Sequence, residues 1–237
     1  MELKNINFSY ENNKPILKDF NLSIQENKIT SIIGPSGVGK TTLLNLIANV
    51  IQPISGEIID KPNITSYLFQ DDRLINEITV YKNLQLVLLS VLKDKNKINE
   101  EIKKYLNLVS LDDCANKYPN ELSGSMRRRI ALIRAFIYPS KLLLMDEPFK
   151  GLDLQLKQEI METFVELYNF NPKTILFVTH DIDESIKISN SILIMSNSPM
   201  KIMKNIFIKE NIDNRNIYTK EFNDIRREIY LQTKKWK

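Results

Sequence analysis

The sequence predicts an α/β fold in which a parallel sheet core carries an N-terminal antiparallel β subdomain and an inserted α-helical subdomain. Strand-like and helix-like segments alternate over residues 141–195, which is typical of a parallel sheet with helices on its faces. Two strand-like segments precede any helix, and a helical stretch interrupts the alternation at about 71–138. We therefore expect one domain over residues 1–210 and a charged, helical tail over 211–237.

The beginning of the chain is dominated by strands. Residues 3–10 and 16–24 are strand-like, with Phe20, Leu22 and Ile24 on one face, and the turn-rich residues between the two segments predict a hairpin. The next expected elements are a strand at 29–33, a helix at 43–47 and short strands at 57–59 and 64–69.

Helical periodicity fills the middle of the chain, and alternation returns after it. Helices are expected at 79–92, 98–109 and 125–138. The later elements are a strand at 141–145, a helix at 154–170, a strand at 174–178, a helix at 182–188, a strand at 191–195 and a helix at 220–231.

Composition restricts the class of protein. The 237 residues are 43% apolar and 26% charged, which is enough for a full core, and the single cysteine, Cys114, fits a buried side chain in a reducing compartment. The first residues lack a secretory segment, and the longest apolar stretch, 84–92, is far shorter than the roughly 20 residues that span a bilayer. The net charge of +4 is mild and scattered, so it does not favour a nucleic-acid-binding face.

A phosphate-binding loop lies between the strand at 29–33 and the helix at 43–47. Its pattern, G-x-x-x-x-G-K-[ST], lets backbone N–H groups curl around phosphates, and the helix N-terminus adds roughly +0.5 charge. In this motif Lys40 reaches the β and γ phosphates and the Thr41 hydroxyl ligates Mg²⁺. The sequence therefore predicts binding of a nucleoside triphosphate. The expected binding residues are Gly34, Pro35, Ser36, Gly37, Val38, Gly39, Lys40, Thr41 and Thr42.

Two carboxylates follow a strongly apolar strand. Residues 142–145 are apolar and run directly into Asp146 and Glu147. The carboxyl end of a buried strand is where an α/β sheet places ligand groups. We expect Asp146 to hold Mg²⁺, directly or through water, and Glu147 to take a proton from the attacking water.

In their order along the chain, these motifs resemble the ATP-binding subunit of an ABC transporter, whose fold is a P-loop NTPase with a RecA-like core. Gln70, at a strand end, matches the family glutamine that contacts Mg²⁺ and the attacking water. Leu122-Ser123-Gly124-Ser125-Met126 resembles the family signature Leu-Ser-Gly-Gly-Gln, a helix N-terminus that caps the γ-phosphate bound to the other subunit. Asp153 lies in Gly151-Leu152-Asp153, a segment similar to the family loop that crosses the dimer interface. The resemblance implies that Ser123, Gly124, Ser125 and Asp153 contact ATP.

Two further residues take roles from the resemblance. His180, the only histidine, follows the strand at 174–178, where the switch histidine of the family touches the γ-phosphate. With Glu147, Lys40 and Gln70 it completes the expected catalytic set. Tyr10 matches the aromatic residue that stacks on adenine, and Phe8 is the alternative.

The signature segment departs from the family pattern in two places. Ser125 replaces the second glycine, which brings a side chain and a φ restriction close to the phosphate. Met126 replaces the signature glutamine, as in the form Leu-Ser-Gly-Gly-Met-Arg-Gln-Arg that is common among importers of nitrate, sulfonates and taurine. Arg128 takes the place of the glutamine in that form. The triple arginine at 127–129 could bind a polyanion, but helical spacing sends the three side chains to different faces.

Several segments narrow the resemblance to importers of nitrate, sulfonates and taurine. They are residues 70–74, 79–83, 146–149 and 192–199, the last being a strand and turn that precede a final strand. The resemblance implies an ATP-hydrolysing importer subunit at the cytoplasmic side of the cell membrane. It also implies a second ATP-binding subunit, a separate transmembrane permease and an extracellular solute-binding protein as partners, and no nucleic acid.

Some readings stay open. Residues 74–92 could form a socket for the permease, or Leu84, Leu86, Val87 and Leu88 could belong to the subdomain core. Ser125 could weaken or abolish hydrolysis, in which case the subunit regulates or pairs with another cassette. ABC proteins that act on ribosomes or DNA usually carry two cassettes or a coiled-coil insertion, and exporters are normally fused to membrane helices; the sequence has none of these features.

Overall fold

The computed structural model describes residues 1–10, 14–213 and 215–236. The smaller of its two sheets is antiparallel, in the order β2-β1-β4. Its strands are β1 (Glu2–Phe8), β2 (Leu17–Ser23) and β4 (Ser55–Ile59). Helix α1 (Lys40–Ile47) lies between this sheet and the larger one, and its Leu43 and Ile47 are buried among residues of both. The two strands of the predicted N-terminal hairpin therefore pair, and β4 extends their sheet; residues 11–13 of the predicted turn lie outside the described residues.

The larger sheet has six strands in the order β5-β6-β7-β3-β8-β9. They are β3 (Ile29–Ile33), β5 (Thr65–Leu68), β6 (Leu142–Asp146), β7 (Thr174–Thr179), β8 (Ser191–Met195) and β9 (Ile202–Phe207). The first five strands in that order are parallel, and β9 pairs antiparallel with β8 at the edge. In β6, Leu142 and Leu144 pack toward α1, whereas Leu143 and Met145 pack on the opposite face. Burial on both faces explains why this strand is apolar throughout.

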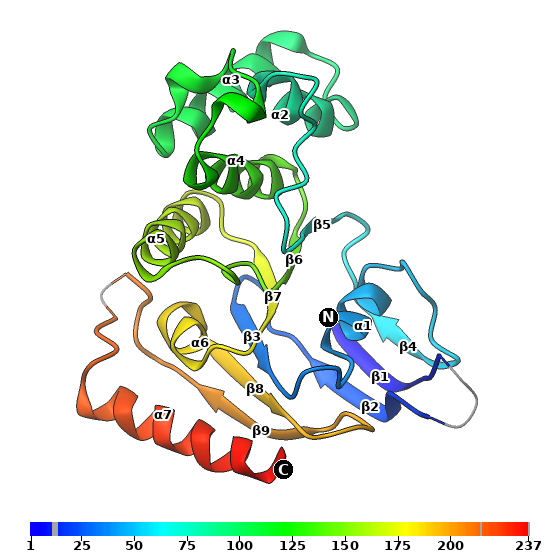
Figure 1. Ribbon diagram of the computed structural model, residues 1–237. Coiled ribbons are helices and arrows are strands. Elements are labelled where there is room, and N and C mark those ends of the chain that lie inside the picture. The colour runs from blue at the N-terminus through cyan, green and yellow to red at the C-terminus, as the bar shows by residue number, and fades with distance from the viewer. Residues whose placement is uncertain (11–13, 214, 237) are drawn as a thin grey trace.

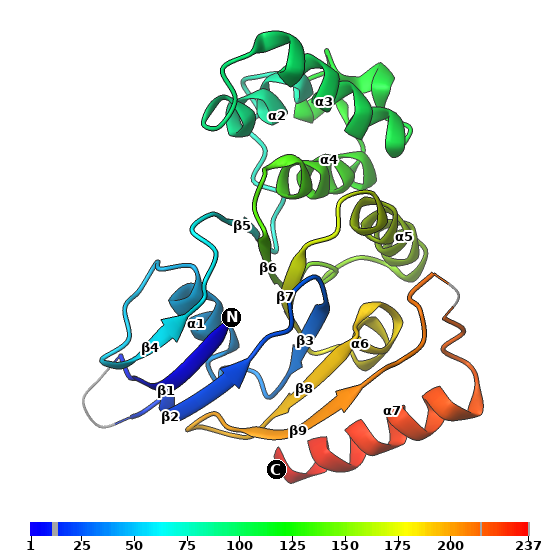
Figure 2. The same ribbon diagram turned by 180° about the vertical axis from the view of Figure 1, so that it is seen from behind.

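Helices α5 (Leu154–Phe170) and α6 (Ile182–Ile188) lie on the second face of this sheet, and α7 (Lys220–Thr233) lies along its edge (Figure 1). The tail helix α7 buries Phe222 and Ile229 against α6 and β8, and the Trp236 indole N–H donates to the Met195 carbonyl at 2.7 Å. Figure 2 shows α7 beside β9, at the opposite side of the molecule from α1.

The inserted helices form a separate layer above the sheet (Figure 1). They are α2 (Val80–Leu89), α3 (Lys95–Leu108) and α4 (Gly124–Ile137). Two 3₁₀ turns, Asp112–Cys114 and Pro119–Glu121, lie between α3 and α4. Helix α3 begins three residues earlier than expected because Asp94 caps it, accepting from the amides of Asn96 and Lys97. Helix α2 ends at Leu89 rather than at 92. Cys114 is buried, as expected.

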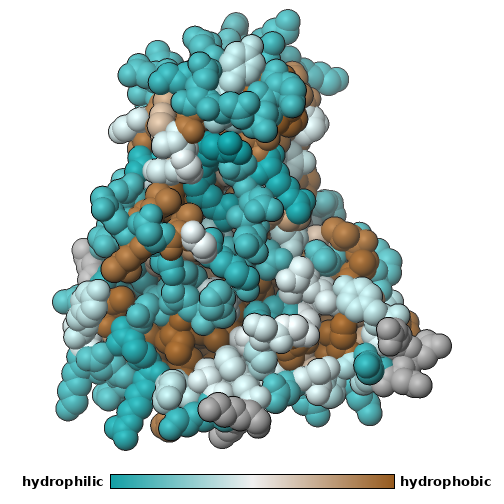
Figure 3. Space-filling view, viewed as in Figure 1, coloured by the Kyte–Doolittle hydropathy of each residue, from teal (hydrophilic) through white to brown (hydrophobic). Residues whose placement is uncertain are grey.

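The predicted fold class is confirmed: a parallel core carries an antiparallel β subdomain and an inserted helical subdomain. Within the larger sheet, the antiparallel edge strand β9 departs from the strand–helix alternation that builds the parallel strands. Hydrophobic patches interrupt a mainly hydrophilic surface in Figure 3. Over the described ranges, no helix combines the length and apolarity needed to cross a membrane.

Candidate nucleotide-binding site

The phosphate loop connects β3 to α1 and depends on glycine at its end. Gly39 precedes α1 with φ of 112°, and no side chain caps the helix at this end. A Cβ atom at Gly39 would collide with the Cγ2 atom of Ile16. Both the left-handed backbone and the close approach therefore require glycine. The first amides of α1 are left without a side-chain cap, which is the geometry of an anion-binding helix N-terminus.

The Lys40 ammonium lies inside the loop. It donates to the carbonyls of Gly34 at 2.7 Å and Pro35 at 2.8 Å, and the residue is only 7% exposed. Burial lowers the pKa of Lys40, and the carboxylates of Glu147 and Asp146, which raise it, offset part of that effect. The loop thus holds a buried cation next to two acidic groups.

Asp146 ends β6 and meets the first turn of α1. Its Oδ1 accepts a hydrogen bond from the Thr41 hydroxyl at 3.2 Å. Burial raises the pKa of Asp146 more than the Thr41 hydrogen bond lowers it. A hydroxyl and a carboxylate in contact suit Mg²⁺, which prefers oxygen ligands and takes its remaining ligands from phosphates and water. No group of three or more acidic, histidine or cysteine side chains that could form a complete metal cage occurs in the described part of the chain.

Glu147 adopts an unusual backbone conformation immediately after the strand. Its φ is 45°, and its N–H donates to the Val178 carbonyl of β7 at 3.0 Å. A left-handed conformation costs a non-glycine residue on the order of 1–3 kcal/mol and is typical of functional sites. The Glu147 carboxylate forms an ion pair with Lys150, and its Oε1 lies 3.6 Å from Nδ1 of His180. Burial raises the pKa of Glu147, but these two contacts outweigh burial, so the net pKa is lowered.

His180 reaches Glu147 because β6 and β7 are neighbouring parallel strands. Asp146 pairs with Val178, so the loops after both strands leave the sheet at the same edge. The His180 side chain is 58% exposed. It lines a separate cavity of about 620 Å³ that also includes Asp183 and, from α7, Arg226 and Tyr230.

Tyr10 extends toward α1 from the end of β1. Its ring is packed edge-on against Phe8 with the centroids 5.0 Å apart, and its hydroxyl lies 3.3 Å from Thr42 Oγ1. Tyr10 is 64% exposed, whereas Phe8 is buried. Of the two aromatic candidates, only Tyr10 presents a ring surface to a ligand.

These residues converge on one cavity of about 460 Å³. Its lining is Tyr10, Ile16, Ser36, Gly37, Gly39, Lys40, Thr41, Thr42, Asp146, Glu147 and Lys150. Gly34 and Pro35 participate through their carbonyls, and Val38 is buried in the core instead. Two lining residues, Ile16 and Lys150, were not expected. Lys150 belongs to no recognisable motif. Its position three residues after Glu147 is the one sequence signal that could have identified it.

The signature residues and Asp153 lie outside this cavity. Ser123 is exposed and caps α4 by accepting from the Met126 amide at 3.2 Å. Asp153 caps α5, accepting from the Leu156 amide at 2.9 Å. Ser125 lies within α4 and does not have a positive φ, so the expected φ restriction puts no strain on its backbone.

Gln70 also lies outside the cavity, on a loop that the arginines of α4 hold. Arg128 is buried and donates to the carbonyls of Phe69, Gln70 and Pro148. Arg127 pairs with Asp72 at 2.9 Å, and Arg129 pairs with Glu159 at 3.2 Å. The three consecutive arginines therefore have three different sets of partners, as helical spacing predicts.

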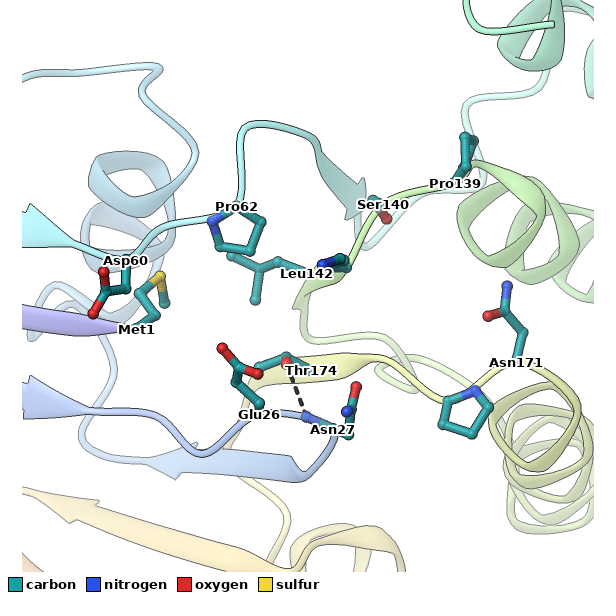
Figure 4. Close-up of a pocket in the computed structure, with 12 residues that line it drawn as sticks. Met1, Glu26, Asn27, Asp60, Pro62, Pro139, Ser140, Leu142, Asn171 and Thr174 are labelled. Atoms are coloured by element: carbon teal, nitrogen blue, oxygen red, sulfur yellow. Dashed lines mark hydrogen bonds between the residues drawn. The ribbon is translucent and has the colours of Figure 1, made fainter.

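A further cavity of about 420 Å³ lies at the amino edge of the large sheet, away from the phosphate loop (Figure 4). Met1, Glu26, Asp60, Pro139 and Asn171 contribute to its lining. The Asn27 amide donates to Thr174 Oγ1 at 3.0 Å across one side of it. None of the predicted site residues lines this cavity.

The site agrees with comparisons to known proteins. The sequence model of the ABC transporter family matches residues 17–150, more than half of the chain. The chain is 37% identical over 225 residues to an aliphatic sulfonates import ATP-binding protein of Bacillus cereus, covering 92% of this chain and 88% of that one. It is 38% identical over 192 residues to a nitrate import ATP-binding protein of Synechococcus elongatus, covering 77% of this chain and 29% of that one.

Solved structures agree with the sequence relatives. The dimeric structure of a bacterial ABC transporter cassette matches with a TM-score of 0.73 and 27% identity, covering 89% of this chain and 99% of that one. A dimeric post-hydrolysis cassette bound to ADP and phosphate matches with a TM-score of 0.71 and 27% identity over the same shares. The chain therefore belongs to the ABC transporter family and is one of its ATP-binding, ATP-hydrolysing subunits.

Proposed function

We propose that this chain powers an importer, driving uptake of a small solute of the nitrate, sulfonate or taurine class through a separate membrane permease. The observation that carries the proposal is the single cavity in which the phosphate loop, Asp146 and Glu147 meet. The relatives named as sulfonate and nitrate import proteins support the direction of transport and the solute class. The subunit works at the cytoplasmic face of the cell membrane, attached through the permease.

Residues in and beside the cavity take separate roles in this proposal. Residues 34–42 bind the phosphates, and Tyr10 stacks on the adenine. Thr41, Asp146 and Gln70 hold Mg²⁺, which neutralises phosphate charge when bound. The Glu147 carboxylate, next to His180, accepts a proton from the attacking water. His180 also contacts the terminal phosphate.

A second copy of the chain completes the site. Ser123, Gly124, Ser125 and Asp153 are available at the surface rather than in the cavity, so they act on ATP held by the other copy. The dimeric cassettes among the similar structures support this arrangement.

We further propose that residues 1–210 form one ATP-binding domain with the helical insert at 71–138, and that residues 211–237 form a tail.

The permease docks on the helical subdomain. A cavity of about 320 Å³ lies between β5, α2 and α4, lined by Tyr67, Val87, Ser90 and Arg134 among others. Leu86 and Leu89 are exposed on α2, whereas Leu84 and Leu88 are buried in the core. The socket is therefore made of the exposed members of 74–92. An extracellular solute-binding protein delivers the solute to the permease, and this chain has no nucleic-acid partner.

The first experiment measures ATP hydrolysis by the purified chain, alone and with the permease encoded beside it. Glu147→Gln is expected to lower turnover by about 10² to 10⁴ while leaving ATP binding intact. Glu166→Gln, at an exposed glutamate on α5, is the matched control and should keep full turnover. ATP binding without turnover in the wild-type complex would instead support a regulatory subunit that pairs with another cassette.

Solute class is tested in vesicles that contain the complex and its solute-binding protein. Transport of labelled taurine, an alkanesulfonate or nitrate across the vesicle membrane should require ATP on the side of the membrane where this chain is bound. Uptake of none of the three would contradict the proposed solute class.

A further inference from the structure

Lys150 lies in the cavity although no motif assigns it a role. The turn after β6 brings it there: the Lys150 N–H donates to the Glu147 carbonyl at 3.2 Å, and Glu147 has a left-handed backbone. Phe149 is fully buried between them and anchors the turn in the core. The Lys150 side chain is thereby directed back over the carboxylate of Glu147.

The two lysines of the cavity differ in freedom. The Lys40 ammonium is buried and donates to two loop carbonyls. The Lys150 side chain is 44% exposed, and its ammonium is paired with Glu147. Lys150 therefore keeps donors available to a ligand, and its exposed side chain can change partner without unfolding any element.

Electrostatics favour an anionic ligand for this second cation. Asp146 and Glu147 both line the cavity. With Asp146 assigned to Mg²⁺, the Glu147 carboxylate is the one that remains to repel the terminal phosphate. An ammonium beside Glu147 offsets that repulsion and can donate charge-assisted hydrogen bonds to phosphate oxygens.

We propose that Lys150 is a second cationic ligand for the terminal phosphate of ATP, with Glu147 as its partner when no nucleotide is bound. This inference rests on the proposed function, because it requires the cavity to bind ATP. It adds selectivity for ATP over ADP, since ADP lacks the group that Lys150 contacts. Once Lys150 has turned to the phosphate, the Glu147 carboxylate is free to accept a proton.

The test measures ATP and ADP affinities by calorimetry in the Glu147→Gln background, where hydrolysis is blocked and Lys150 has no carboxylate to neutralise. Adding Lys150→Met is expected to weaken ATP binding about tenfold or more and ADP binding less than about twofold. Lys150→Arg, which keeps the charge, should restore most of the ATP affinity. Lys201→Met, at an exposed lysine before β9, is the control and should change neither affinity.

The outcomes separate this inference from the proposed function. Unchanged ATP affinity in the Lys150→Met double variant would mean that Lys150 only neutralises Glu147, and equal losses for ATP and ADP would mean a general charge effect; either overturns the inference. Failure of the wild-type chain to bind ATP would overturn the proposed function as well. Equal melting temperatures of the variants confirm that the comparison is made on folded protein.

Discussion

Two helix N-termini in this molecule differ in how they are capped and in what surrounds them. Helix α1 begins at a left-handed glycine, has no side-chain cap and opens on a cavity with Lys40, Thr41 and two carboxylates. Helix α4 is capped by Ser123, whose hydroxyl already accepts from the Met126 amide, and Ser123 and Gly124 are exposed. The uncapped end of α1 leaves its first amides without a side-chain partner beside a charged cavity. A capped end on the surface contributes only when another surface approaches it.

The strongest test of this comparison exchanges glycine for alanine at each helix. Gly39→Ala forces a Cβ against Ile16 in a left-handed conformation that costs about 1–2 kcal/mol before any clash. We expect ATP affinity to fall at least about tenfold. Gly124→Ala has open space around its Cβ and helical geometry, so it should leave ATP binding by the isolated chain unchanged. Isothermal titration of both variants checks this, and equal losses would show that the two ends do not differ.

The residues of the cavity differ in whether the sequence alone could predict them. The phosphate loop and Asp146-Glu147 are contiguous residues whose local chemistry specifies their role, and the structure brings them to one cavity. Lys150 and Ile16 enter that cavity through a turn and a strand pairing that no local pattern encodes. The helix start at Lys95 was missed for a simpler reason: the cap Asp94 precedes the first apolar residue of the periodic pattern.

The second prediction concerns how α4 is attached to the core. Arg128 is buried and donates to carbonyls on two loops, one carrying Gln70 and the other following Glu147. Arg128→Met leaves these carbonyls without their donor, at about 1–3 kcal/mol each. The melting temperature should fall by at least about 2–4 °C, as expected for about 1 kcal/mol in a chain of this size.

Arg129→Met is the matched control for Arg128. Arg129 is partly exposed and pairs with Glu159, and such a pair contributes about 0–1 kcal/mol. Thermal unfolding should therefore separate the two neighbouring arginines clearly. Equal shifts would mean that α4 is held by packing rather than by the Arg128 contacts.

The third prediction is a pH dependence of the same attachment. Burial raises the pKa of Asp72, but hydrogen bonds from Arg127 and from the Leu74 amide outweigh it, so the net pKa is lowered. A pKa lowered in the folded state means that the stabilisation is complete above the unfolded value of about 3.9 and is lost as pH falls through the folded value. Asp72→Asn should therefore lower the free energy of unfolding by about 1 kcal/mol at pH 7. The difference in the free energy of unfolding between wild type and variant should shrink in acid, and urea unfolding at pH 7 and at a pH below about 3.9 would measure it. A constant difference would exclude the Asp72 charge as its cause.

The smallest effect is expected at Ser125, where the departure from the family signature first suggested a weakened motor. Because Ser125 already has a helical backbone within α4, replacing it with glycine relieves no strain and should cost at most about 1 kcal/mol of stability. Ser125→Gly should therefore leave turnover of the assembled complex within about twofold of wild type, since α4 presents the same backbone amides in either case. A large acceleration in a phosphate-release assay would show that the serine side chain obstructs the second copy. The N-terminus of α4 would then be impaired by the serine side chain, rather than fully able to contact the ATP that the second copy holds.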